Sequence, residues 1–202
     1  MNRFRKIALT GISIATIAAC GTNDGSWTEA ERNIIEQADT LLHVYSIDIE
    51  QETSVLRAKS IDLSDKDINS PLYAKLCHLM LATVQSPAHN GVGIAGPQVG
   101  ISRNLIAVQR FDKEGEPFEL YPNIKIVNAS GEMEIGNEGC LSVPGKKGKV
   151  PRFRHIDISY RLADGRDTTE TVKGYTAIIF QHEFDHLQGV LYTDRASEVT
   201  MR

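Results

Sequence analysis

The stretch QHEFDHLQG, at residues 181–189, contains the residue types that hold and use a catalytic metal ion. His182 and His186 are four residues apart, so in a helix both imidazoles lie on one face and can bind one ion. Glu183 follows the first histidine, where its carboxylate can act on water at that ion. A polar surface helix can show the same pattern by chance. This helix is largely apolar, however, and buried histidines need partners, so a metal site is favoured. Its apolar residues are Ile178, Ile179, Phe180, Phe184 and Leu187.

A catalytic metal site usually has a third protein ligand and an open position. One zinc-protease pattern puts a third histidine six residues after His186, but Tyr192 is found there. Other zinc peptidases use a glutamate far downstream as the third ligand. Here only 13 residues follow Gly189, and Glu198 is their only glutamate, so we expect the third ligand to lie upstream. Cys140, in NEGCLSVPG, is the best candidate because a thiolate binds such metals well. The alternative is a disulfide between Cys140 and Cys77, which an exported protein can form.

Helices in the first half of the chain must support these side chains. Thr28 and Glu31 form a capping-box pattern that predicts a helix over residues 28–44. Residues 46–67 read as extended or irregular. Ser70, followed by a proline, then predicts the start of a second helix. Cys77 lies in that helix as a small hydrophobic residue.

The second half of the chain reads as strands followed by one helix. A Gly- and Pro-rich loop or bent strand, SPAHNGVGIAGPQVG, comes first. Strands are predicted next, and the Asp-Gly pair in RLADGRD indicates a hairpin. The last helix is predicted from near Tyr175 to Leu187, with Gly189 as terminator. This order of elements predicts an α+β fold. The predicted strands are NLIAVQRF, LYPNIKIVN, RHIDISYRL and TTETVKGY.

The composition is that of one globular domain. Of 202 residues, 41% are hydrophobic and 24% are charged. The net charge of −4 and the lack of a long basic run argue against nucleic acid as a partner. We expect a monomer.

The first twenty residues have the layout of an export signal. Arg3, Arg5 and Lys6 precede an apolar run over residues 7–19, which is short for a membrane-spanning helix. The run ends at Cys20, and Ile-Ala-Ala-Cys resembles a bacterial lipobox. That resemblance implies cleavage before the cysteine, a lipid on its sulfur and a place in the cell envelope outside the cytoplasm. The alternatives are an uncleaved membrane anchor and a cleaved signal with an incidental cysteine.

Three motifs in this order, GVGIAGPQVG, EGCLS and QHEFDHLQG, resemble the signature motifs of peptide deformylases. The likeness extends to VLRAKSIDL and VPGKKGKVPR, so it covers about residues 47–195. It implies a compact α+β fold with antiparallel sheets around a central C-terminal helix that carries HExxH. It also implies an enzyme that removes the formyl group from the N-terminal methionine of new peptides. One divalent metal ion is expected, usually Fe(II), with zinc, nickel or cobalt able to occupy the site.

The resemblance also implies a role for each motif residue. Glu183 would act first as the general base and then as the acid. Gln98 and the backbone N–H of Leu141 would donate hydrogen bonds to the developing oxyanion. Glu138 and Arg152 match a structural pair. The implied metal ligands are Cys140, His182 and His186. The implied substrate contacts are Val92, Gly93, Tyr175, Ile178 and Ile179.

Two features depart from the family pattern. The first motif normally has two adjacent alanines, and Gly96 replaces the second, which predicts a looser backbone before Gln98. The second departure is the N-terminus. We expect a signal peptide at residues 1–19 and a lipidated cysteine with a tether and an extra helix at residues 20–46. The catalytic domain is expected at residues 47–202.

Three functions remain open from the sequence. The first is an envelope deformylase that acts on N-formylated peptides. The second is a metallopeptidase or amidase with a shifted substrate. The third is a non-catalytic lipoprotein that binds metal or peptide. The intact Glu183 argues against the third, because a binding site needs no general base.

Overall fold

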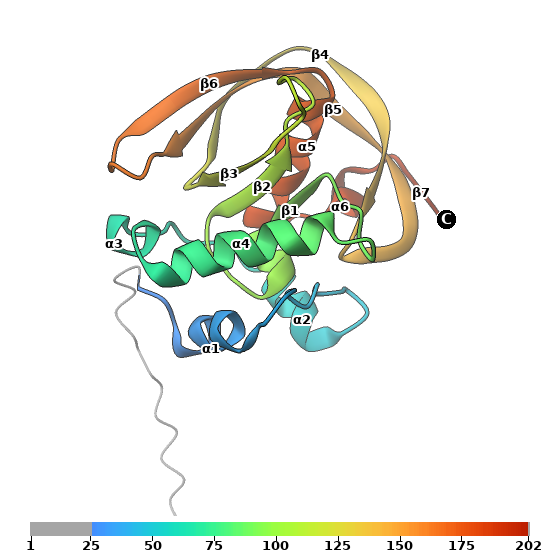
Figure 1. Ribbon diagram of the computed structural model, residues 1–202. Helices are drawn as coiled ribbons and strands as arrows, with labels where there is room; N and C mark the ends of the chain where they lie inside the picture. The colour runs from blue at the N-terminus through green and yellow to red at the C-terminus, as the bar shows by residue number, and fades with distance from the viewer. Residues whose placement is uncertain (1–25, 202) are drawn as a thin grey trace, which may run out of the picture.

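The computed structural model describes residues 26–201, in which two antiparallel sheets surround one long helix (Figure 1). The first sheet has the order β1-β2-β3, formed by Gly93–Ala95, Leu105–Gln109 and Phe118–Pro122. The second has the order β4-β5-β6, formed by Lys125–Cys140, Val143–Arg161 and Asp167–Lys173, and β7 (Glu198–Met201) pairs with β5. Helix α5 (Gly174–Leu187) packs against strands of both sheets. The predicted α+β fold with a central C-terminal helix is confirmed. The predicted signal and Cys20 lie outside the described residues.

The first helix is shorter than predicted. Helix α1 (Glu29–Gln37) begins with the expected capping box, in which Thr28 Oγ1 accepts from the backbone N–H of Glu31 at 3.2 Å. It ends at Gln37, so the prediction of a helix to residue 44 was wrong. Ala38 is extended, and the Leu42 N–H donates instead to Thr83 Oγ1 at 2.8 Å. A long-range hydrogen bond has replaced the local helical one.

The region predicted to be irregular contains two short helices, α2 (Glu50–Leu56) and α3 (Asp65–Ile68). A capping box between Ser64 and Asp67 starts the second of these. Helix α4 (Pro71–Gln85) is confirmed, because Ser70 accepts from the backbone N–H of Tyr73 at 3.2 Å. The last short elements are the 3₁₀ helix η1 (Gly96–Val99) and helix α6 (Tyr192–Arg195).

The predicted strands are all present, with one division. LYPNIKIVN is the end of β3 and the start of β4, and the break falls at Asn123, whose φ is +54°. The Asp-Gly hairpin between β5 and β6 has Gly165 at φ +81°. Strands β4 and β5 form one long hairpin with register shifts that bend it. This bend brings the end of β4 to the helix.

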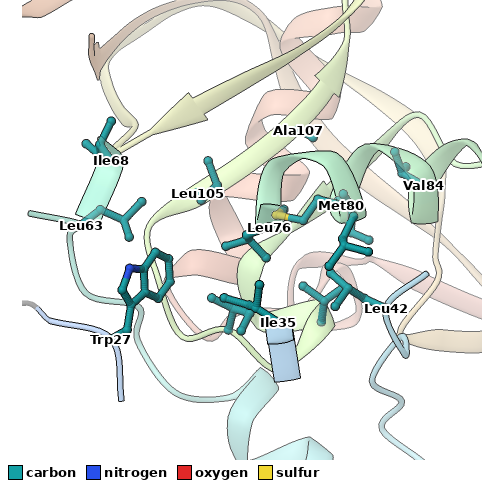
Figure 2. Packing of buried hydrophobic residues seen from close by; sticks show 14 residues of the cluster. Trp27, Ile35, Leu42, Leu63, Ile68, Leu76, Met80, Val84, Leu105 and Ala107 are labelled. Atoms are coloured by element: carbon teal, nitrogen blue, oxygen red, sulfur yellow. The ribbon is translucent and has the colours of Figure 1, made fainter. Parts of the chain in front are cut away.

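Two hydrophobic clusters fix the position of α5 and of the loop before it. The first lies between the N-terminal segment, α4 and β2, where Trp27, Ile35 and Leu42 meet Leu76 and Met80 (Figure 2). The second lies between α5 and the two sheets, and its buried members are Ala95, Ile106, Val108, Tyr121, Ile124, Ile156, Ile158, Val172, Ala177, Ile179, Phe180 and Leu187. Within residues 26–201, every helix is too short or too polar to span a bilayer.

Candidate metal centre

The three predicted ligands meet at one point. Cys140 is the last residue of β4, and His182 and His186 lie on one face of α5. Their ligand atoms all lie within 4.8 Å of one another, and Cys140 Sγ is 3.2 Å from His186 Nε2. Cys77 and Cys140 are both free, so the alternative of a disulfide between them is excluded. Cys77 packs against the first hydrophobic cluster, as a small hydrophobic residue would.

A buried acidic residue orients the first histidine. Glu138 Oε2 lies 2.8 Å from His182 Nδ1, which leaves the opposite ring nitrogen to face the other ligands. Arg152 donates to both oxygens of Glu138, at 2.8 and 3.1 Å, so the predicted structural pair is in contact. Burial opposes ionisation of Glu138, but the hydrogen bonds from His182 and Arg152 outweigh it and lower its pKa to about 2. Tyr192, which holds the sequence position of the third histidine in the zinc-protease pattern, stacks on the His182 ring with the ring centres 6.1 Å apart.

The stretch QHEFDHLQG contains a further structural residue, Asp185, that the sequence reasoning did not identify. Asp185 is buried and accepts from Arg152 Nη1 at 2.6 Å. Arg195 donates to both oxygens of Asp185, at 2.6 and 2.7 Å. A charged residue inside an apolar helix requires such partners, and that requirement was the available signal. The ion pairs anchor the C-terminal half of α5 to β5 and α6.

The charges at this point fit a divalent cation. Burial opposes ionisation of the Cys140 thiol, but His186 and His182 beside it hold its pKa well below the ordinary value. Burial also opposes charge on His182, yet Cys140 and Glu138 raise its pKa well above the usual range. In the protein without metal, the thiolate and the protonated His182 therefore balance each other's charge, and a bound divalent cation would take the place of that proton. The resulting donor set, one thiolate and two imidazoles in a partly buried place, suits Fe(II), zinc and related metals.

Glu183 lies beside the three ligands with one oxygen free to act. Its side chain is buried, and Oε2 has no hydrogen-bond partner among the described residues. Burial raises the pKa of this carboxyl to about 7, against the opposing effect of His182 and His186. Gly93 faces it so closely that a Cβ there would lie 2.5 Å from Glu183 Oε1. A desolvated carboxylate with a free oxygen is suited to accept and return a proton.

Gln98 presents its amide nitrogen to the same point. The Ala95 N–H donates to Gln98 Oε1 at 2.8 Å, which fixes the orientation of the amide. Gln98 Nε2 then lies 3.5 Å from Cys140 Sγ and 3.3 Å from Ser142 Oγ. Leu141 lies between those two residues in the chain, in the turn that joins β4 to β5. Ser142 is a partner that the sequence reasoning did not identify.

The predicted substrate contacts have different surroundings. Ile179 is buried and borders Gly93 next to Glu183. Val92 packs against the second cluster, and Ile178 is partly exposed. Tyr175 is 51% exposed, and its ring lies 5.4 Å from that of Phe111. The structure therefore brings Gly93 and Ile179 to Glu183 and leaves Tyr175 at the surface.

Gly96 is required by close packing. A Cβ at this position would lie 2.6 Å from the carbonyl oxygen of Ile101 and 2.7 Å from that of Arg103. The expected loosening of the backbone is therefore not what the structure shows. The glycine lets a neighbouring turn pack directly on the loop that carries Gln98.

Comparisons with known proteins agree with this geometry. The family model for polypeptide deformylases matches residues 46–202. A peptide deformylase of Symbiobacterium thermophilum is 39% identical over 151 residues, covering 75% of this chain and 66% of that protein. Peptide deformylase 2 of a Nostoc species is 43% identical over 136 residues, covering 64% of this chain and 75% of that protein. A Met-Ala-Ser-bound class I type b peptide deformylase of Acinetobacter baumannii superposes with a TM-score of 0.69 at 33% identity, covering 78% of this chain and 99% of the other.

Proposed function

Because this chain belongs to the polypeptide deformylase family, we propose that the site formed by Cys140, His182 and His186 hydrolyses the formamide bond of N-formylmethionyl peptides. The protein is a metal-dependent hydrolase of the deformylase type. The observation that carries the proposal is the free, buried carboxylate oxygen of Glu183 beside this donor set. A site that only binds metal or peptide has no need of such a group.

The chain's own residues divide the chemistry among them. Cys140, His182 and His186 would hold a metal ion, which would supply Lewis acidity toward the formyl carbonyl and toward water. Glu183 accepts a proton from the attacking water and returns it to the departing amine nitrogen. Gln98 Nε2 and the Leu141 N–H donate to the oxygen on which negative charge develops. Val92, Gly93, Tyr175, Ile178 and Ile179 form the proposed contacts to the peptide.

Fe(II) is the metal that we propose for this site. A thiolate beside two imidazoles accepts Fe(II), and zinc, nickel or cobalt can replace it. The same thiolate makes the site sensitive to oxidation, so an Fe(II) enzyme should lose activity in air. We also propose that the protein acts as a monomer.

Formate release tests the proposed function. The full-length chain, purified in mild detergent and loaded anaerobically with Fe(II) or Ni(II), should release formate from a short formyl-Met peptide. The acetyl-Met peptide of the same sequence is the matched control. We expect its turnover to be at least about a hundredfold slower, because the extra methyl group displaces the carbonyl carbon from the groups that act on it. Folded, metal-loaded protein that releases no formate would contradict the proposal and favour an amidase with another substrate.

We further propose that the enzyme is lipid-anchored in the cell envelope. The supporting features are the basic start, the apolar run over residues 7–19 and Cys20. Cys20→Ser should abolish incorporation of a labelled fatty acid into the protein while formate release per molecule stays the same. The matched control is Cys77→Ser, which should take up the label like the original protein. No label in the original protein, or equal labelling of all three proteins, would contradict a lipid on Cys20.

A further inference from the structure

The N-terminal segment, here residues 26–45, precedes the range that the family model matches. It nevertheless contributes large side chains to the core of the domain. Trp27, Ile35 and Leu42 are 5%, 0% and 4% exposed, and all three enter the first hydrophobic cluster (Figure 2). A tether would not bury three large apolar side chains in the domain core.

A buried ion pair joins this segment to the turn after Gln98. Arg103 is 0% exposed, and it donates from Nε and Nη2 to the two oxygens of Glu31, at 2.9 and 2.7 Å. Its guanidinium also lies over the Trp27 ring, 5.3 Å from the centroid. Glu31 closes the capping box of α1 with Thr28 as well. Glu31 therefore takes part both in the start of α1 and in holding Arg103, which also donates from Nη2 to the Ser26 carbonyl of the same segment.

The backbone of this turn bears directly on the catalytic loop. The carbonyl oxygens of Ile101 and Arg103 lie where a side chain at Gly96 would be. The Ile101 N–H donates to the Gly96 carbonyl at 3.0 Å. Gly96 begins η1, the 3₁₀ turn that carries Gln98. A shift of Arg103 would therefore move the backbone that sets the amide of Gln98.

A second contact from the same segment reaches Gln98 itself. The Tyr45 N–H donates to the Gln98 carbonyl at 2.8 Å. The Tyr45 ring and Ile34 cover Gly100, where a Cβ would lie 2.5 Å from Tyr45 Oη and 3.0 Å from Ile34 Cδ1. Gly100 ends η1 with a φ of +78°. The N-terminal segment thus holds both ends of the turn that presents Gln98.

We propose that the N-terminal segment is a positioning element for the catalytic amide, and that Arg103, held by Glu31, is the positioning residue that acts through Gly96 on Gln98. This proposal rests on the proposed function, because Gln98 matters only as a donor to the oxyanion. It assigns to the extra helix a part in turnover besides its part in folding.

Glu31→Gln tests the proposal in the full-length, metal-loaded protein. Glutamine keeps the capping-box pattern but removes the negative charge of Glu31 that faces the Arg103 guanidinium. We expect kcat to fall about tenfold, because small displacements of catalytic groups are costly. The KM for the formyl peptide and the metal content should stay unchanged. In a Gln98→Ala background the same substitution should lose less than about twofold, since its target is gone.

Two further variants separate positioning from loss of stability. Ile158→Ala removes a buried side chain of β5 that makes none of the contacts described above between Glu31 and Gln98. It should lower the thermal midpoint while kcat stays within about twofold at a temperature where the variant is folded. If Glu31→Gln fails to fold, the double variant Glu31→Gln, Arg103→Gln removes the buried charge and should fold with the same fall in kcat. An unchanged kcat in Glu31→Gln, or in the double variant if only that one folds, would overturn the proposal. A full tenfold loss that persists in the Gln98→Ala background would overturn it as well. If Gln98→Ala alone keeps the original kcat, the proposed role of Gln98 fails, and the positioning role fails with it.

Discussion

Glu183→Ala will keep the metal and lose turnover by about 10²–10⁴-fold, the range for removal of a general acid–base group. The reason is geometric, because Glu183 lies beside the three ligands and its Oε2 atom has no hydrogen-bond partner among the described residues. The substitution leaves the contact between His182 and Glu138 in place. Metal content, measured by elemental analysis, should therefore stay at one ion per chain while formate release falls.

Glu183→Ala should also leave the protein as stable as before or more stable. A buried carboxyl with an unsatisfied oxygen costs free energy in the folded state, so its removal relieves that cost. Thermal unfolding of the metal-loaded variant measures this directly. Glu183→Gln is the matched control, because it keeps the shape of the side chain but cannot accept the proton, and it should be equally slow. A normal rate in either variant would show that another group moves the proton.

The convergence of the candidate ligands could be predicted from the sequence, because these residues lie in short motifs with fixed spacing. His182, Glu183 and His186 need only one helix to bring them together, and α5 provides it. Cys140 was predicted by its chemistry, since Tyr192 occupies the position of a third histidine after the helix. The structure brings its sulfur to 3.2 Å from His186. Here the local pattern and the tertiary structure agree.

The parts that sequence reasoning missed depend on contacts between distant segments. The helix predicted over 28–44 ends early because Leu42 finds a partner in Thr83, 41 positions away. Arg103 and Glu31 are 72 positions apart, and no local pattern marks their pairing. Gly96 looked like a loosened backbone because its neighbours in space, not in sequence, decide its role. Propensity and periodicity report on neighbouring residues only.

Gly93→Ala will reduce turnover at least about a hundredfold, because one methyl group displaces the catalytic carboxylate. A Cβ at Gly93 would lie 2.5 Å from Glu183 Oε1 and 2.8 Å from Ile179 Cγ2. Both neighbours are buried, so neither has free space in which to move. Steady-state formate release from the formyl-Met peptide, with metal content measured in parallel, checks the result.

Gly139→Ala is the matched control for this prediction. It also adds one methyl group to a glycine of the site region, next to Cys140, but the nearest atom would be the Lys146 carbonyl oxygen at an ordinary 3.8 Å. Turnover by Gly139→Ala should stay within about threefold of the original, since no neighbour has to move. Combining Gly93→Ala with Glu183→Ala decides between two causes. If the methyl group acts by moving the carboxylate, the double variant will be no slower than Glu183→Ala alone. A further hundredfold loss would instead mean that Gly93 acts on the peptide strand, independently of Glu183.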